Sequence, residues 1–341
     1  MNYAGIDLAS KSSAVAVVDE QGNVMEQREV ATDAGQLAKV LAPFAPVSVV
    51  VESSPLAEWA CQVLEEAGHR AQIIDARAAK HLMDARKKTD RRDAQTLAQI
   101  VRSGWFQPVH RKSDSARLER SQLQGRQGLV RTYCSLDSQI RGLLRAHGIC
   151  LGRVSKSRFA QRVRERAQQH SEALVAVLEP LLAVYEHSLE QAEAMKKQMQ
   201  AQQREDELQQ QLQSVPGVGP LTAKVFASTV DDPRRFANGE QVADYAGLTP
   251  GVTQSGERCV RGSITRQGDH LLRWHLVEAA HAMIRQGGDC RLKRWARQLA
   301  ETKGAAKARV ALARKLAIVL WRLWLKGERF EPEHGTTGAA A

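Results

Sequence analysis

The chain has 341 residues, of which 43% are hydrophobic and 26% are charged, and its formal net charge is +11. This length allows about two domains with a sizeable core, and no uninterrupted apolar run approaches the roughly 18 residues that a membrane-spanning helix needs. Five scattered cysteines give neither a disulfide framework nor a zinc pattern, and the N-terminus offers no signal peptide, so a cytoplasmic protein with reduced thiols is expected.

The N-terminal segment predicts strands first and then strands that alternate with helices. Three short antiparallel strands are expected between residues 3 and 30. Residues 47–51 form a continuous β-branched run, which is typical of a strand buried on both faces. Ser54 and Pro55 are expected to form the N-cap and the first turn of the helix that follows, and residues 71–77 to form one more strand.

The stretch KKTDRRDAQTLA contains no Gly or Pro and predicts a helix. On that helix Asp90 and Asp93 share a stripe with the apolar residues Leu97 and Val101. A carboxylate that faces a core without a partner is strongly destabilising or takes up a proton, so both acids need an explanation. Lys or Arg partners at a surface seam are one explanation, and a bound metal ion is the other.

Basic residues are concentrated in two regions. Residues 109–170 hold fourteen Lys and Arg against four acids, and residues 285–329 hold thirteen against three. Such arginine-rich surfaces suit phosphate backbones, although a solvated basic face without a ligand is the alternative. A membrane-surface helix at 308–326 is a weaker possibility, because its basic residues are spaced through the apolar pattern. The predicted nucleic-acid contacts in the first region are Arg111, Arg117, Arg120, Arg141 and Arg145.

A long polar helix is expected from Leu181 to about Leu212, with apolar residues every three or four positions as far as Met199. This pattern favours a coiled-coil arm used in self-association, and a single solvent-exposed helix is the alternative. The following stretch SVPGVGPLTAKVFAST is similar to a helix-hairpin-helix, in which Gly217 and Gly219 would let backbone N–H groups hold a phosphate. A tight turn that only packs two helices is the competing interpretation.

Four acids can be combined into one site. Asp7 lies on the leading strand, Glu52 ends the buried strand, and Asp90 and Asp93 lie on a later helix. In ribonuclease H-like folds, acids placed in this way converge at one end of a sheet. Converged carboxylates repel one another, and one or two Mg²⁺ ions would remove the repulsion while polarising a phosphate. The sequence therefore predicts a magnesium site made by these four side chains.

These residues give the chain a family resemblance. It resembles the Asp-Glu-Asp-Asp transposases of the insertion-sequence one-ten family, which are similar to the Piv DNA invertases. The N-terminal motifs are GIDLAS, VVVES and KTDRRDAQTLA, and the later ones are SVPGVGPLTA, YAGLTP, QSG and ITRQGDHLLR. They cover most of residues 1 to 300 in the family's order. Two positions depart from the pattern: Ser53 follows Glu52 where Thr-Gly is expected, and Asp269 stands where Asn is usual.

The resemblance implies an α/β plus α architecture in four parts. A RuvC-like, ribonuclease H-like metal domain would occupy residues 1–160, and a helical coiled-coil arm residues 161–213. A mostly helical C-terminal transposase domain that contains the helix-hairpin-helix would occupy residues 214–333. The tail, residues 334–341, is expected to be disordered.

The resemblance also implies a chemistry. The chain would be a bacterial, cytoplasmic enzyme that cuts and rejoins donor and target DNA, with Ser255 as a nucleophile that forms a phosphoserine intermediate. Guidance by a structured RNA that the element encodes is implied for at least part of the family. Because two duplexes must be joined, a dimer or tetramer is expected. The loop around the serine adds the predicted nucleic-acid contacts Arg258, Arg261 and Arg266.

Several functions remain open on the sequence. A RuvC-like structure-specific nuclease would need the four acids and water but no serine. A Piv-like site-specific invertase would use the same groups as a transposase. A non-enzymatic nucleic-acid-binding protein with a decayed site is disfavoured by the complete carboxylate set. No Ser-His spacing identifies a base for Ser255, although His270 and His275 lie downstream.

Overall fold

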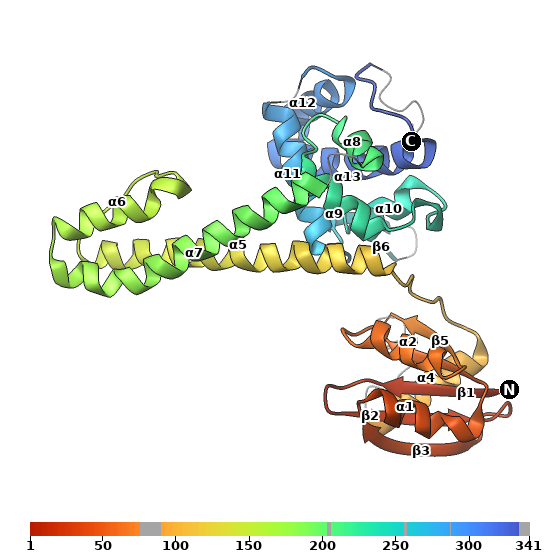
Figure 1. Ribbon diagram of the computed structural model, residues 1–341. Coiled ribbons are helices and arrows are strands. Elements are labelled where there is room, and N and C mark those ends of the chain that lie inside the picture. The colour runs from red at the N-terminus through yellow and green to blue at the C-terminus, as the bar shows by residue number, and fades with distance from the viewer. Residues whose placement is uncertain (76–89, 203–205, 256–257, 287, 334–341) are drawn as a thin grey trace. The chain divides into compact units, whose positions relative to one another are not determined.

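The computed structural model describes residues 1–75, 90–202, 206–255, 258–286 and 288–333 (Figure 1). The chain divides into two compact units, Met1–Lys112 and Ser113–Ala341. The first unit ends at Lys112, whereas the expected first domain runs to residue 160. The reason is that the helix after residue 112 makes its contacts with helices later in the chain.

The first unit is built on a mixed five-stranded sheet with the order β3-β2-β1-β4-β5. The first three strands are antiparallel, as the sequence predicts, and β4 and β5 run parallel to β1. This is the arrangement that a ribonuclease H-like fold requires. The strands are β1 (Asn2–Asp7), β2 (Ser12–Val18), β3 (Val24–Ala31), β4 (Val47–Glu52) and β5 (Arg70–Ile74).

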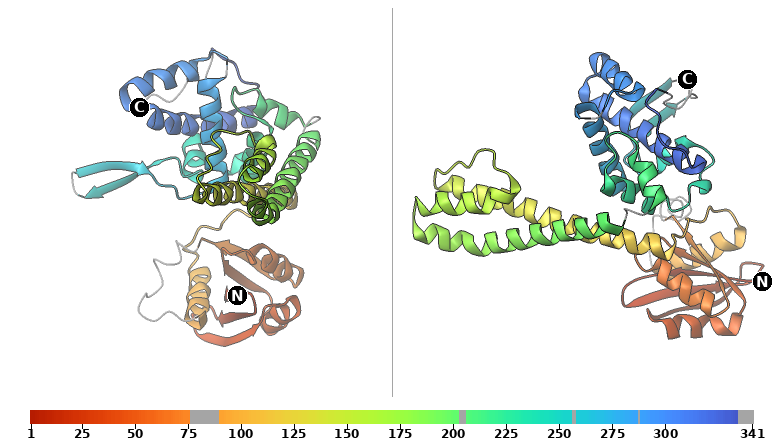
Figure 2. Two further views of the ribbon diagram at one scale, coloured as in Figure 1. Left: turned by 90° about the vertical axis from the view of Figure 1, so that its left-hand side faces the viewer. Right: turned by 45° about the horizontal axis from the view of Figure 1, so that its top comes forward.

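Helices cover both faces of this sheet. On one face α1 (Ala34–Leu41) and α2 (Ala57–Glu66) share a core with alternate residues of β1 and β4. The other face is covered by α4 (Asp90–Ser103) (Figure 2, left). This two-sided burial explains the continuous apolar run of β4, because its successive side chains enter opposite cores.

The predicted cap of α2 is wrong. The helix begins at Ala57 after Leu56, and no side chain caps it. The N–H of Ser53 instead donates to the carbonyl oxygen of Ile74 at 2.9 Å and extends the pairing of β4 with β5. A turn, in which the N–H of Ala57 donates to the carbonyl of Ser54, then separates strand from helix.

Gly5 lets α4 approach the sheet closely. A Cβ atom at Gly5 would lie 2.1 Å from the carbonyl oxygen of Ala94 and 2.4 Å from the backbone nitrogen of Ala98. These are backbone atoms of a packed helix, so they can move only if the whole helix moves. Strand and helix are therefore in direct backbone contact at this point.

We expect Gly5→Ala to lower the free energy of unfolding by about 3 kcal/mol or more, because overpacking against backbone cannot relax through a side chain. Chemical denaturation followed by circular dichroism measures this loss. Gly142→Ala is the matched control: Gly142 lies in a helix with open space around its Cβ position, so alanine there should be neutral or slightly stabilising. Equal stabilities of the two variants would contradict the close packing.

The second unit begins with a long helical hairpin. Helix α5 (Asp114–Ala146) runs out, α6 (Lys156–Gln168) lies at the far end, and α7 (Glu172–Gln202) returns beside α5 (Figure 1). The apolar seam predicted on the long helix is buried at Tyr185, Ala192 and Met199. It lies in the core of the hairpin and of the adjoining domain, so α7 is not a solitary helix and the seam packs within the chain.

The rest of the second unit is a helical domain with one β-hairpin. Its core surrounds α13, which packs on α10, α11 and α12. The apolar side of α13 is thus internal, as its spaced basic residues predict. Among the described residues, no helix is long and apolar enough to cross a membrane. The elements are α8 (Glu207–Gln213), α9 (Pro220–Val230), α10 (Gly239–Tyr245), β6 (Pro250–Ser255), β7 (Arg258–Ile264), α11 (His270–Arg285), α12 (Arg291–Lys303) and α13 (Ala305–Lys326).

Candidate functional site

Two of the predicted acids end neighbouring parallel strands. The register of β1 and β4 pairs Ile6 with Val51, so Asp7 and Glu52 follow at the same edge of the sheet. Both residues are half-buried. Strand alternation also fixes the face on which they lie, because Gly5 contacts α4 and residue 7 is two positions later on the same strand.

Glu52 lies on that same face. Val50, two residues before it, belongs to the core formed with Leu97 of α4. Residues two apart on a strand share a face, so Glu52 and Asp7 both belong to the side of the sheet that α4 covers. The sheet therefore brings two acids from distant parts of the sequence to one edge and one face.

Helix α4 brings the third acid to this edge. The side chain of Gln99 donates to the carbonyl of Gly22, in the turn at the opposite edge of the sheet, at 2.8 Å. The helix therefore runs antiparallel to β1, and its N-terminus lies where β1 and β4 end. Asp93, one residue before the contact of Ala94 with Gly5, is only 7% exposed. The N-terminal end of a helix favours a carboxylate.

The fourth acid is placed differently. Asp90 is the first residue of α4 and is exposed, whereas Asp93, Leu97 and Val101 on the predicted stripe are buried. The stripe prediction is thus correct for three of its four members. A helix contacts the sheet along its length, but its first residue extends past the strand ends into solvent.

The donor chemistry at this edge suits a hard divalent cation. Carboxylate oxygens are the ligands that Mg²⁺ prefers. Asp93 forms no ion pair or side-chain hydrogen bond with another residue in the described part of the chain, although it is buried. Within the described ranges, no three His, Cys, Asp or Glu side chains lie close enough together to form a metal centre as they stand. Asp7, Glu52 and Asp93 lie at the same end of the sheet, but their carboxylate groups do not converge on one point.

The predicted nucleophile lies in the second unit. Ser255 is the last residue of β6 and pairs with Arg258 across the β6–β7 hairpin. The side chains of Ser255, Arg258 and Arg261 lie outside the described residues. Arg266, beyond the hairpin, is exposed and has a left-handed backbone with φ of 55°.

The base of this hairpin is tightly interlocked. A Cβ atom at Gly268 would lie 2.3 Å from the carbonyl oxygen of Tyr245, and Gly268 and Gly247 both have positive φ. The N–H of Thr265 donates to the carbonyl of Thr249 at 2.9 Å. The sequence stretches YAGLTP and ITRQGDHLLR are therefore the two sides of one structural base that holds the strands of the hairpin.

Two ion pairs that were not predicted link α5 to this base and to α9. Arg120 pairs with Asp269 and donates to the hydroxyl of Thr229 at 2.6 Å. The adjacent Glu119 accepts from the buried Lys224 of α9 at 2.7 Å. Asp269 also caps α11 by accepting from the N–H of Leu272, so its carboxylate has two partners, this N–H and the guanidinium of Arg120. These pairings join residues more than a hundred positions apart, so no local pattern could have predicted them.

The two glycines of the predicted helix-hairpin-helix differ in environment. Gly217 has φ of 85°, and its Cβ position would meet the backbone of α11 at 2.4 Å from the carbonyl oxygen of Ala279. Packing alone therefore explains Gly217. Gly219 is the N-cap of α9, and its Cβ position faces open space. Phosphate binding at this turn stays a prediction.

His275 is buried in the helical core and is 3.5 Å from the hydroxyl of Thr222. Burial, reinforced by the nearby charge of Arg126, lowers the pKa of His275 to about 4. The ring is therefore neutral at pH 7. A neutral imidazole can accept a proton, but burial keeps this one away from solvent.

The predicted nucleic-acid arginines divide into two groups. Arg111 pairs with Glu58 and Glu65 within the first unit. In the second unit Arg117 pairs with Asp114, Arg120 with Asp269, and Arg141 with Asp137. Arg145 is exposed and forms no ion pair among the described residues. Four of these five arginines therefore form ion pairs within the chain.

Comparisons with known proteins match both units. The family model described as "Transposase IS116/IS110/IS902 family" matches residues 209–296, and a DEDD-type IS110 model described as "Transposase" matches residues 4–149. The "Transposase for insertion sequence element IS1111A" of Coxiella burnetii is 28% identical over 332 residues, covering 96% of this chain and 90% of the relative. The "Probable family 20 transposase" of Pseudomonas aeruginosa is 28% identical over 339 residues, covering 97% and 99%. Among solved structures, T. thermophilus RuvC in complex with a Holliday junction substrate matches 32% of this chain and 99% of its own, with 20% identity and a TM-score of 0.26.

Proposed function

The chain belongs to the IS116/IS110/IS902 family of transposases, and we propose that it cuts and rejoins DNA with a carboxylate-held Mg²⁺ and a serine nucleophile. The observation that supports the metal site is the placement of three acids at the same end and on the same face of the sheet. Asp7 and Glu52 end adjacent parallel strands on the face that α4 covers, and α4 begins at that edge with the buried Asp93.

The residues of this edge have distinct roles in the proposal. Asp7, Glu52 and Asp93 would hold the ion, and the exposed Asp90 would complete the set from the first turn of α4. When bound, Mg²⁺ polarises a phosphodiester and stabilises charge that develops on its oxygens. The close contact of Gly5 with α4 positions Asp93 against the strand ends, so the packing of the fold serves the site directly.

Ser255 supplies the rejoining step in this proposal. Its Oγ attacks phosphorus, an Oγ–P bond forms, and one P–O bond of the phosphodiester breaks. The serine proton passes to a base, and the departing strand end leaves as a hydroxyl after it gains a proton. The phosphoserine link retains the energy of the broken bond, so a hydroxyl of another strand can attack it and release the serine. Attack by water would lose that energy.

The partners follow from the same chemistry. Donor and target DNA are the proposed substrates, and the net charge of +11 supports binding of polyanions. A structured guide RNA and assembly as a dimer or tetramer belong to the proposal through the family. Inversion in place of transposition would use the same groups. A hydrolytic nuclease is the alternative function, and it would not need Ser255.

Metal removal tests the proposal. Purified protein incubated with DNA that carries the element ends should cut strands in Mg²⁺, and EDTA should abolish the cutting, as measured on denaturing gels. Binding to the same DNA, measured in EDTA by mobility shift, separates a loss of chemistry from a loss of affinity. Strand cutting that continues at full rate in EDTA would refute the metal site.

A further inference from the structure

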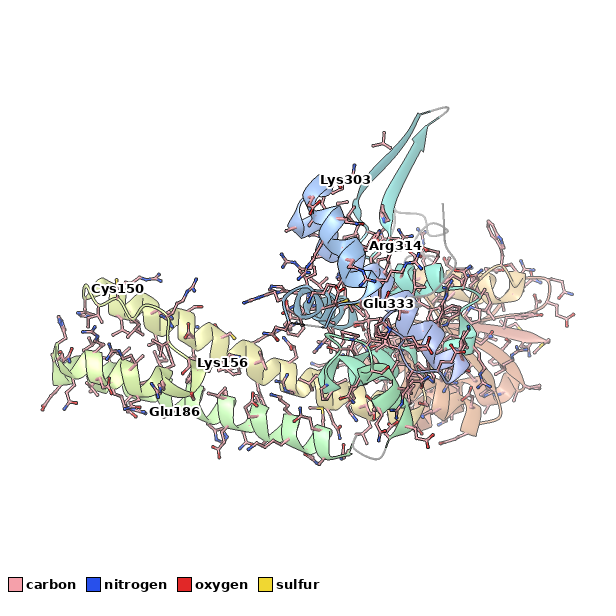
Figure 3. All side chains as sticks on the ribbon, turned by 90° about the horizontal axis from the view of Figure 1, so that it is seen from above. Cys150, Lys156, Glu186, Lys303, Arg314 and Glu333 are labelled. Carbon is pink, nitrogen blue, oxygen red and sulfur yellow. The ribbon has the colours of Figure 1, made fainter. Side chains whose placement is uncertain are left out.

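The far end of the helical hairpin carries a group of exposed arginines. We define the arm tip as residues 145–166, which comprise the end of α5, the connecting loop and most of α6. Figure 3 shows this end of the hairpin with Cys150 and Lys156 labelled. Four arginines of the arm tip are exposed: Arg145, Arg153, Arg158 and Arg162.

The arm tip is held in a defined conformation. Arg141 donates to Asp137 at 2.8 Å and to the carbonyl of Gly152 at 2.9 Å, and its guanidinium lies over the ring of Phe159. Through these three contacts Arg141 holds the loop against α5. Arg141 thus has a structural role, and its predicted contact with nucleic acid stays a prediction.

Aromatic residues fasten the other end of the loop. Lys156 donates to the hydroxyl of Tyr133 at 2.8 Å, and the hydroxyl of Tyr185 donates to the carbonyl of Lys156 at 3.2 Å. The rings of Phe159 and Tyr185 pack 4.8 Å apart. The exposed arginines therefore project from a fixed scaffold, which lowers the entropy lost when they bind a ligand.

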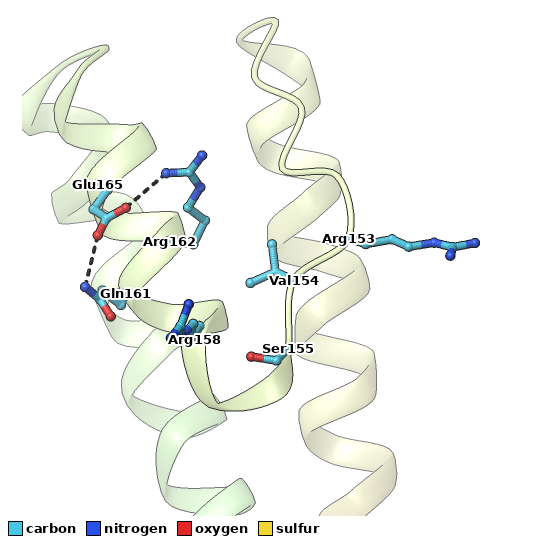
Figure 4. Close-up of a pocket in the computed structure, with 7 residues that line it drawn as sticks. All are labelled: Arg153, Val154, Ser155, Arg158, Gln161, Arg162 and Glu165. Carbon is cyan, nitrogen blue, oxygen red and sulfur yellow. Dashed lines mark hydrogen bonds and ion pairs between the residues drawn. The ribbon is translucent and has the colours of Figure 1, made fainter. Parts of the chain in front are cut away.

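Three of these arginines line one open hollow, and the side chain of Arg153 extends away from α6. Arg153 comes from the loop, and Arg158 and Arg162 come from the first turns of α6, as the close-up in Figure 4 shows. Arg153 and Arg158 form no ion pair or side-chain hydrogen bond within the described part of the chain. Arg162 forms an ion pair with Glu165 at 3.2 Å, and both of these side chains are close to half exposed. One acid, Glu165, thus lines the hollow together with three arginines.

From this arrangement we propose that the arm tip binds the sugar–phosphate backbone of a double-stranded nucleic acid. Guanidinium groups match phosphate oxygens in geometry and charge, and each neutralised phosphate releases counterions. The aromatic residues of this region, Tyr133, Phe159 and Tyr185, are all at most 3% exposed. Among the described residues the arm tip thus exposes no Phe, Tyr or Trp ring for the base stacking that single-strand binding uses, and its exposed ring is the imidazole of His147. The proposal rests on the proposed function in one respect, that the chain acts on nucleic acid.

The test is the salt dependence of binding by a double variant, R153Q with R158Q, in the full chain. Duplex DNA, an RNA hairpin and single-stranded DNA are the three probes. We expect the affinity for duplex to fall on the order of tenfold. The slope of log K against log salt should become shallower by about two, because each lost phosphate contact leaves about 0.9 counterion on the duplex when the protein binds. A loss confined to DNA or to RNA identifies which duplex the arm tip binds.

Two further variants control the result. K39Q with R70Q removes the same charge from exposed positions of the first unit and should leave the slope nearly unchanged. E165Q frees Arg162 from its acid and should strengthen binding. An equal loss in both double variants, unchanged affinity of R153Q with R158Q, or a larger loss for single-stranded DNA would overturn the proposal. Strand cutting by the unaltered chain is assayed separately, so failure of the proposed function is distinguishable from failure at the arm tip.

Discussion

Replacement of Asp93 by Asn is expected to abolish DNA strand cutting and to leave the fold intact. Asn has nearly the same shape, so the packing of α4 on the sheet is preserved, and no ion pair with another described residue is lost. The change removes the negative charge that would hold Mg²⁺ at the end of β1 and β4. Loss of a directly coordinating carboxylate should lower the cutting rate by at least about a hundredfold, since even indirect metal partners contribute tenfold to a hundredfold.

Two comparison variants replace carboxylates that are exposed, unlike that of Asp93. Glu66→Gln removes a carboxylate from an exposed position at the end of α2 and should cut DNA normally. Asp90→Asn removes the exposed acid of the predicted set, and a loss of cutting there would establish that the first turn of α4 takes part. Thermal unfolding of each variant verifies the fold. If Asp93→Asn cuts DNA at the rate of the unaltered chain, the carboxylate site is wrong.

Replacement of Ser255 by Ala is expected to abolish rejoining of strands and formation of any covalent protein–DNA link. The hydroxyl is the atom that forms the Oγ–P bond in the proposed mechanism, and alanine offers no nucleophile. Ser255 is the last residue of β6, at the opposite end of that strand from the interlocked base at Gly247 and Gly268, so the substitution should not affect folding.

A nicked or suicide DNA substrate allows the covalent link to be trapped. Digestion and mass spectrometry should place the adduct on Ser255, and the adduct should be absent from the Ser255→Ala protein. Asp93→Asn serves as the matched control, because it retains the hydroxyl but should fail for lack of metal. An adduct on a different residue, or normal recombination by Ser255→Ala, would favour the hydrolytic nuclease.

Local patterns in the sequence were sufficient for most of the first unit. The antiparallel strands, the doubly buried β4 and the inward face of α4 were predicted correctly because side-chain periodicity directly reflects which face of an element is buried. The cap of α2 was not, because Ser54 and Pro55 lie in a turn before the helix, which begins at Ala57.

The difference in burial between Asp93 and Asp90 shows what helical periodicity does not predict, even where the helix itself is predicted correctly. Both residues lie on the same stripe of α4, but Asp93 is buried and Asp90 is exposed. The difference depends on where the strands end beneath the helix. That position is a property of the sheet and of its contact with Gly5, and the helical pattern does not contain it.

The same distinction applies to the arginines of the second unit. Composition by itself determined that this region is basic and suited to polyanions. Only the tertiary structure decided that Arg120 belongs to Asp269 and Arg141 to the loop of the arm tip, while Arg153 and Arg158 remain exposed. Charge density is a sum over residues and can be read from the chain. The pairing of a charge depends on which distant residue the fold brings beside it.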